Sequence, residues 1–248
     1  MKRFTLYIIS CFFIGTVFAQ NRVDSVVKQV ERNNKSIQTN KKYWQAKQLE
    51  FKTGLTPYDP QVEYDYLFGS PVGAGNQKDF TITQRLDFPT VYKRKKELSG
   101  QQIAQTTLQQ QVYRKDILLE AKLLFLEIVY LNKKGEELNR RLLNTQKLVT
   151  DYQKKLDKGD VIILDVNKAR LQLLNIQNEV KLNENEKQVL LTKISELNGG
   201  TVIAINDTIY PFVPAIPEFE ILDSTIEAND PIIKVYEQEK KIDRKSVV

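Results

Sequence analysis

The feature that most constrains this fold is a helical pattern that continues from about Val91 to about Lys158. Over its last two-thirds, apolar side chains return with alternating four- and three-residue spacing, which is typical of a helix packed along another helix. A helix of this length extends about 100 Å, more than a compact globular domain of this size can contain. The members of this first seam are Ile117, Ala121, Leu124, Ile128, Leu131, Gly135, Leu138, Leu142, Thr145, Val149, Tyr152 and Leu156.

One turn signal, Lys158-Gly159-Asp160, separates this helix from a return helix at about 161–197. Asn183 and Lys187 are the weak members of its seam, as Gly135 and Thr145 are of the first. A tight turn between two heptad helices predicts an antiparallel coiled-coil hairpin with its tip near Gly159. The second seam is Val166, Ala169, Leu173, Ile176, Val180, Asn183, Lys187, Leu190, Ile194 and Leu197.

Between Leu118 and Leu131 additional apolar residues widen the stripe of the long helix. We expect this section to be buried on more than one side. The additional residues are Leu119, Leu123, Phe125, Leu126, Val129 and Tyr130.

Upstream, at about 60–88, the apolar period changes to two, which predicts a hairpin of two strands of about nine residues. Strands of this length suit a tilted crossing of a bilayer, although a soluble sheet with one buried face has the same alternation. The apolar face is Val62, Tyr64, Tyr66, Phe68, Phe80, Ile82, Leu86 and Phe88. The polar face is Gln61, Glu63, Asp65, Thr81, Thr83, Arg85 and Asp87.

A first helix is predicted from Val23 to about Phe51, and residues 201–205 (TVIAI) are predicted to form a strand. Residues 30–37 are then matched by residues 226–233 at a constant offset of 196. This match predicts a tandem repeat. The domains expected are a first repeat at 20–200, a connector at 201–217, and the start of a second, truncated repeat at 218–248.

The first 19 residues have the pattern of a secretory signal peptide: Lys2 and Arg3, an apolar stretch, and small residues before a cleavage site after Ala19. Cys11, the only cysteine, is expected to leave with it, although Ile8-Ile9-Ser10-Cys11 faintly resembles a lipoprotein box. The chain has no histidine. These absences disfavour metal sites, cofactor chemistry and histidine-based catalysis, so we expect no enzyme.

The net charge of +6 arises from lysines and arginines mixed with acids and amides along the helices. That pattern indicates solvated helix faces rather than nucleic-acid binding. Lys93, Arg94, Lys95 and Lys96 form a solvated or headgroup-facing cluster.

The order and lengths of these elements resemble the first half of the TolC-like outer-membrane efflux family. The tip carries Gly159, Asp165 and Ala169 at the family's spacing, and Asn33-Asn34-Lys35-Ser36-Ile37 is similar to its Asn-Pro opening, with Lys35 in place of proline. Asn229-Asp230-Pro231 keeps the proline. The stretch QRLDFPTVYKRKKE resembles the heavy-metal branch, the CusC- and CzcC-like proteins.

The resemblance implies a mainly α fold: long antiparallel helices in a periplasmic α-barrel, with a transmembrane hairpin in a trimeric outer-membrane β-barrel. It implies a homotrimer embedded in outer-membrane lipid, and as partners a periplasmic adaptor and an inner-membrane pump, often of the resistance–nodulation–division type. Residues 201–217 would be the equatorial connector. The polar strand face would line the lumen, and the apolar face would contact lipid.

At the tip we expect adaptor docking and gating by Gly159, Asp160, Val161, Ile162 and Asp165. Asp165 also suits an N-cap of the return helix. Two alternatives remain: a periplasmic coiled-coil adaptor, which would need β-rich domains beside the helical hairpin, and a type I secretion or nodulation-type outer-membrane component, which shares the fold.

Overall fold

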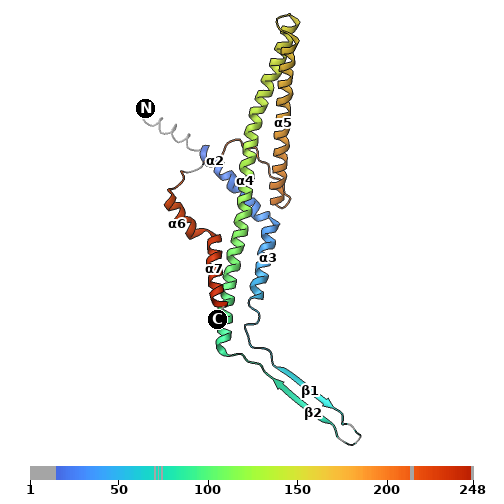
Figure 1. Cartoon of the computed structure of the whole chain (residues 1–248), viewed down its shortest axis with the longest axis vertical. Helices are drawn as coiled ribbons and strands as arrows, with labels where there is room; N and C mark the ends of the chain where they lie inside the picture. Colours follow the sequence, from blue (N-terminus) through green and yellow to red (C-terminus); the bar gives the residue numbers. More distant parts are fainter. Residues whose placement is uncertain (1–14, 70, 72, 74, 213–214, 247–248) are drawn as a thin grey trace, which may run out of the picture. The chain divides into compact units, whose positions relative to one another are not determined.

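The computed structural model describes residues 15–69, 71, 73, 75–212 and 215–246. Lys2, Arg3 and Cys11 of the predicted signal peptide lie outside these residues. The elements are α2 (Gly15–Asn33), α3 (Lys35–Glu50), β1 (Gln61–Leu67), β2 (Gln77–Thr83), α4 (Pro89–Asp157), α5 (Ile163–Leu197), α6 (Phe219–Asn229) and α7 (Pro231–Ser246). They are labelled in Figure 1.

The chain divides into two compact units. The first comprises Met1–Gln38 and Arg114–Ile216, and the second comprises Thr39–Tyr113 and Pro217–Val248. The long helix α4 contributes residues 114–157 to the first unit and residues 89–113 to the second.

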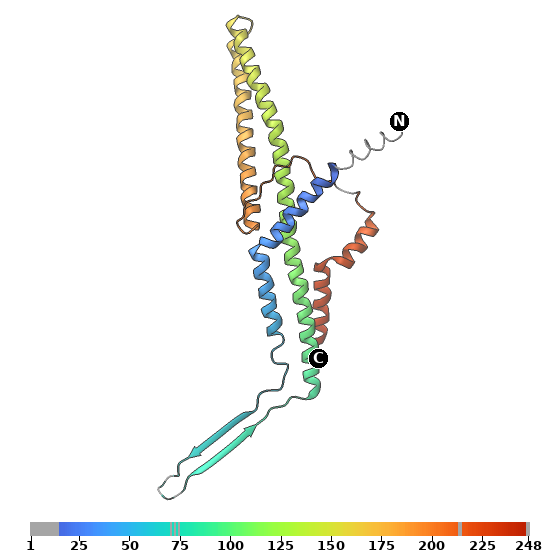
Figure 2. The ribbon, with the colours of Figure 1, turned by 180° about the vertical axis from the view of Figure 1, so that it is seen from behind.

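In the first unit, α5 returns beside the later part of α4, so the predicted antiparallel helical hairpin is confirmed (Figures 1 and 2). Every member of both predicted seams is buried or half-buried. Ile128 on α4, and Val166 and Ile194 on α5, are fully buried. Removing these side chains from water is the main stabilisation of the coiled coil, about 1.5–3 kcal/mol for each large aliphatic side chain.

Two of the weak seam members, Gly135 and Asn183, meet each other across the helical hairpin. The side-chain amide of Asn183 donates a hydrogen bond to the Leu131 carbonyl at 3.1 Å. A Cβ atom on Gly135 would lie 3.1 Å from that same amide nitrogen, so glycine leaves the space that the asparagine occupies. A buried asparagine with one specific partner fixes the register of a coiled coil at some cost in stability.

The core of the first unit lies where α2 and the segment around Ile203 and Ile205 cover α4. Asn132 donates hydrogen bonds to the carbonyls of Ile205 and Asp207, at 3.1 and 2.9 Å. The predicted strand at 201–205 is wrong: the segment is extended, but side chains rather than a neighbouring strand satisfy its carbonyls. The buried cluster is Val26, Val30, Ile117, Ala121, Leu124, Phe125, Ile128, Val129, Leu131, Leu190, Ile194, Ile203 and Ile205.

The widened stripe of α4 is covered on one side only. Phe125 and Val129 are buried beneath this core, whereas Leu119, Leu123 and Tyr130 are about half exposed. The prediction of burial on more than one side is therefore wrong for these three residues within the described chain. The reason is that α2, α5 and the 203–205 segment leave that side of α4 open.

The predicted first helix is interrupted at Asn34. Its side-chain oxygen accepts the Ile37 N–H at 2.8 Å, which caps α3, and its amide donates to the Leu197 carbonyl at 2.7 Å. Lys35 is thus the first helical residue, a position that also suits proline. A continuous helical pattern concealed this break because asparagine satisfies the freed backbone groups by itself.

The break between α6 and α7 has the same hydrogen bonds at the predicted offset of 196. The Asn34 N–H bonds to the Val30 carbonyl at 2.8 Å, and the Asp230 N–H bonds to the Ile226 carbonyl at 2.7 Å. Asp230 also accepts the Ile232 N–H at 2.8 Å, so Pro231 is the first residue of α7. The two helix pairs are therefore locally alike.

In the second unit, α3 and α7 pack on the early part of α4 (Figure 2). The contacts are polar: Gln48 donates to the Thr106 hydroxyl at 2.8 Å, and Gln238 donates to the Gln101 side chain at 2.7 Å. Every fully buried apolar side chain among the described residues belongs to the first unit. Hydrogen bonds therefore join the helices of the second unit beside apolar side chains that are only half-buried, such as Trp44 and Ile103.

Gly199 ends α5 with φ +69°, and a Cβ atom there would lie 2.5 Å from the Asn33 carbonyl oxygen. We expect Gly199→Ala to lower the free energy of unfolding by about 3 kcal/mol or more, because a backbone carbonyl cannot move aside cheaply. Gly200→Ala is the matched control, since φ is +91° but the space is open. It should cost only about 1–2 kcal/mol. Equal losses in urea unfolding would contradict the close approach.

Candidate functional site

The register of the β-hairpin separates its side chains into two faces. Val62 pairs with Ile82 and Tyr64 with Phe80, which places these four side chains on one face. The opposite face carries Gln61 paired with Thr83, Glu63 with Thr81, and Asp65 with Asp79. The predicted alternation is confirmed over the length of the two strands.

The apolar face of the hairpin is uncovered. Val62 is 63% exposed and Phe80 is 64% exposed, and Tyr64 and Ile82 are similar. A soluble sheet with one buried face would shield these side chains, and nothing in the described part of the chain does so. A continuous apolar and aromatic face of this kind marks a surface for lipid or for another protein.

Each strand has seven residues rather than the nine expected, because the ladder ends at Thr83. Gln84 turns out of the ladder and donates its side-chain amide to the Tyr58 carbonyl at 2.7 Å. Arg85, Leu86, Asp87 and Phe88 consequently follow the strand instead of belonging to it, and Phe68 lies just beyond β1. These five residues lie outside the two strands, and their assignment to the lumenal and lipid faces stays a prediction.

Asp87 instead organises the junction between β2 and α4. Its N–H bonds to the Tyr92 hydroxyl at 2.9 Å, and its carboxylate pairs with the Lys95 ammonium at 3.1 Å. The hydrogen bond to Asp87 raises the pKa of Lys95. The sequence predicts that Lys95 belongs to a solvated or headgroup-facing cluster, and the structure pairs it with Asp87.

Asp79 was overlooked among the polar strand residues. It directly opposes Asp65, and its carboxylate accepts hydrogen bonds from Gln77 at 2.9 and 3.0 Å. Opposed carboxylates destabilise a strand pair unless water or cations surround them. Extending the alternation one step before Phe80 would have identified this residue.

The tip, residues 158–165, begins with a glycine C-cap. Gly159 has φ +78°, and its N–H bonds to the Leu156 carbonyl at 2.9 Å. The Asp160 N–H reaches the Lys155 carbonyl at 2.9 Å. These two bonds form a Schellman motif, which ends α4. Residues 158–162 then connect α4 to α5. The predicted turn is confirmed.

The exposed apolar residues of the tip differ from those predicted. Val161 is half-buried, whereas Ile162, Ile163 and Leu164 are 62%, 55% and 53% exposed. Ile163 and Leu164 were missed because they belong to the first turn of α5, where an amphipathic pattern gives no sign of which side is covered. Gly159 and Asp160 are exposed as well.

The cap of α5 is Ile162, which makes no side-chain cap hydrogen bond. Asp165 is therefore not the N-cap, and that alternative was wrong. It is the third helical residue, half-buried, with its carboxylate 3.9 Å from the Lys168 ammonium. A carboxylate in the first turn still favours the positive end of the helix dipole.

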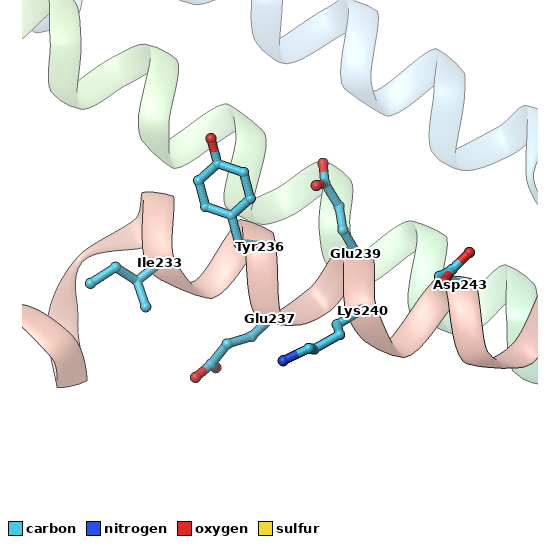
Figure 3. Close-up of a pocket in the computed structure, with 6 residues that line it drawn as sticks. All are labelled: Ile233, Tyr236, Glu237, Glu239, Lys240 and Asp243. Atoms are coloured by element: carbon cyan, nitrogen blue, oxygen red, sulfur yellow. The ribbon is translucent and has the colours of Figure 1, made fainter.

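A groove of about 470 Å³ lies on α7. Its six lining side chains, labelled in Figure 3, all come from that helix: Ile233, Tyr236, Glu237, Glu239, Lys240 and Asp243. At the offset of 196, the shielded α3 residues Ile37, Asn40, Trp44 and Lys47 correspond to Ile233, Tyr236, Lys240 and Asp243. Four of the six groove residues therefore correspond to half-buried residues of α3, whereas Glu237 and Glu239 correspond to the exposed Lys41 and Tyr43.

No group of three His, Cys, Asp or Glu side chains in the described part of the chain is placed to hold a metal ion. None of its helices is long and apolar enough to cross a membrane. The candidate sites in the described part of the chain are exposed surfaces on the hairpin, at the tip and on α7.

No family model and no curated protein matches this sequence. Solved structures do match. The Campylobacter jejuni CmeC outer membrane channel is 16% identical with a TM-score of 0.67, covering 91% of this chain and 52% of that one. A Pseudomonas aeruginosa membrane protein is 13% identical with a TM-score of 0.71, covering 90% and 55%. CusC is 14% identical with a TM-score of 0.61, covering 80% and 47%.

This chain thus has the fold of the TolC-like outer-membrane channels, and the resemblance is confirmed at the level of fold. It spans about half the length of the structures it matches, at 47–55% of their chains. CusC and CmeC match with similar TM-scores, so the heavy-metal branch stays a prediction. The adaptor alternative needed β-rich domains, whereas the described residues contain one two-stranded sheet.

The uncapped end of α5 leads to a test of the tip. We expect Ile162→Ser to raise the free energy of unfolding by about 0.5–1 kcal/mol, because serine would supply the missing cap. Ile163→Ser, one residue inside the helix, cannot cap and should change it by less than about 0.5 kcal/mol. Thermal unfolding followed by circular dichroism measures both. A marked loss of stability in either variant would show that these side chains are packed rather than free.

Proposed function

We propose that this chain forms half of each subunit of a trimeric outer-membrane channel, a passive conduit for export in a tripartite efflux system. The exposed apolar face of the hairpin, attached to a fold shared with outer-membrane channels, is the observation that carries the proposal. The strands would lie in the outer membrane, and the helices in the periplasm.

The hairpin supports this function through its unpaired edges. A two-stranded sheet has backbone N–H and C=O groups open on both outer edges, and in lipid each unsatisfied group costs several kcal/mol. Further strands must therefore close the sheet into a barrel. The apolar face of Val62, Tyr64, Phe80 and Ile82 would then contact lipid, and the polar face of Glu63, Asp65 and Asp79 would line a wet lumen.

The helices support closure as well. Besides its buried seam, α5 carries a second apolar stripe on its opposite side, exposed within the described chain: Leu171, Leu174, Leu182 and Val189. A helix with apolar stripes on two sides needs neighbours on both. A ring of such helices meets this need at every position, which is the geometry of an α-barrel.

The α7 groove would receive a second helix equivalent to the early part of α4. Leu222 and Ile226 on α6 correspond to Val26 and Val30 on α2, which are buried against α4, but both are exposed. The second pair of helices thus offers the surfaces of the first pair without their partner. A subunit would contain two such repeats, and three subunits would close the barrel.

Conduction requires a continuous polar path rather than a catalytic step. At the tip, the exposed Ile162, Ile163 and Leu164 offer apolar surface to the helices of a periplasmic adaptor, which would connect the channel to an inner-membrane pump. Asp160 and Asp165 from three subunits would ring the entrance and favour closure through pairing with basic groups. A type I secretion component would share all of these features.

The proposal is tested by conductance of the full-length protein in planar bilayers. We expect trimer-sized pores that are mostly closed, and we expect Asp165→Asn to raise the leak several-fold, because neutral side chains no longer hold the entrance shut. Asp151→Asn, an exposed carboxylate on α4 before the tip, is the control and should leave the leak unchanged. Absence of pores would refute the channel; an unchanged leak in Asp165→Asn would refute only the gating role.

A further inference from the structure

In the second unit, the end of α3, the first turns of α4 and the end of α7 lie beside one another. All three segments carry positively charged side chains. The Ser99 hydroxyl on α4 donates a hydrogen bond to the Phe51 carbonyl at the end of α3. The Lys245 ammonium on α7 lies 3.2 Å from the Glu97 carboxylate on α4. These contacts fix the end of α3 and the end of α7 beside the first turns of α4, next to the base of the β-hairpin.

We name the exposed cations at this level the basic collar. They come from all three segments, and Arg94 also contacts another group of the chain. Two nearby acids are already paired: Asp87 with Lys95 at 3.1 Å and Glu97 with Lys245 at 3.2 Å. The members of the basic collar are Lys52, Lys93, Arg94, Lys96, Lys241 and Arg244.

Helix stability does not explain the members of the collar that lie on α4. The first turn of α4 contains no acidic residue, and Lys93, Arg94 and Lys96 follow it directly. Cations near the positive end of a helix dipole destabilise the helix. Lys93 and Lys96 make no ion pair in the described part of the chain to offset this cost. An anion outside the chain would offset it.

Aromatic side chains connect the collar to the hairpin. The Arg85 guanidinium lies 5.9 Å from the ring centre of Tyr58, and the Lys95 ammonium lies 5.7 Å from that of Tyr92. Tyr58 and Phe88 are more than half exposed. Aromatic rings next to lysines and arginines are typical of the boundary between hydrocarbon and headgroups. This continuity favours a lipid surface over an acidic protein as the occupant.

The distances agree with that placement. Lys93 to Lys96 follow the start of α4 at Pro89 by four to seven residues, or about 6–10 Å along the helix. Headgroup regions are about 5–8 Å thick on each side of the hydrocarbon. Lysine side chains extend toward an interface while keeping the ammonium in water.

We infer that the basic collar binds the phosphate groups of anionic phospholipids in the leaflet that faces the helices, and so sets the depth of the channel in the membrane. This inference rests on the proposed membrane channel. Lys52, Lys93 and Lys96 are exposed contributors from the two segments that flank the hairpin.

The test compares the full-length protein with the triple variant Lys52→Gln, Lys93→Gln, Lys96→Gln. The control removes the same charge from exposed positions of the first unit: Lys147→Gln, Lys181→Gln, Lys193→Gln. Each protein is reconstituted in vesicles of phosphatidylcholine alone or mixed with phosphatidylglycerol, and bound lipid is counted by native mass spectrometry. We expect the triple variant to lose about tenfold in preference for phosphatidylglycerol, while the control retains it.

Equal preference in the triple variant and the unchanged protein would overturn the lipid assignment, as would an equal loss in the control. Loss of adaptor binding with lipid preference intact would assign the collar to a protein partner instead. Insertion into phosphatidylcholine vesicles separates the two claims. If the unchanged protein does not insert, the channel proposal fails and this inference fails with it; if all three proteins insert, the comparison judges the collar alone.

Discussion

The need for further neighbours is the constraint on which this structure depends. Several elements carry apolar surface or unpaired backbone groups that a single neighbour cannot cover. The helix α5 buries one seam against α4 and leaves leucines exposed on its opposite side. The β-hairpin has two unpaired edges, and the α7 groove is lined from one helix only. Rings of strands and of helices satisfy all three demands at once, since a closed ring has no terminal member.

The tip departs from the locally most stable sequence, which agrees with the docking role proposed for it. A helix gains about 1 kcal/mol from a serine, threonine, aspartate or asparagine cap. The chain places Ile162 there and follows it with two more exposed apolar residues. Such departures from the locally best residue concentrate at sites of function. The same reasoning applies to the cations that follow the start of α4.

The sequence predicted the elements whose signal is periodic. The heptad seams identified α4 and α5, and the alternation of Val62, Tyr64, Phe80 and Ile82 identified the hairpin face, because in both cases burial repeats with the geometry of the backbone. Gly159 identified the turn, since a glycine C-cap needs a positive φ. The low identity of the matched structures, such as 16% for CmeC, agrees with patterning rather than particular residues as the determinant.

Features decided by one side-chain contact were not predictable. The break at Asn34 depends on a cap and on the Leu197 carbonyl, and the early end of β2 depends on Gln84 reaching Tyr58. The segment at 201–205 was predicted to be a strand, but no strand pairs with it, and Asn132 binds the Ile205 carbonyl instead. Exposure was not predictable either. Periodicity showed that α4 is broadly apolar between 118 and 131, but it did not show which side of the helix stays uncovered in this chain.

The central claim is that the two faces of the hairpin meet lipid and water respectively. Single cysteines can be placed along β1 of a full-length protein from which other cysteines have been removed, and labelled with a fluorophore after reconstitution. The account predicts alternating quenching: a lipid-soluble quencher acts at positions 62 and 64, and aqueous iodide acts at 63 and 65. Equal access of iodide to all four positions would contradict it.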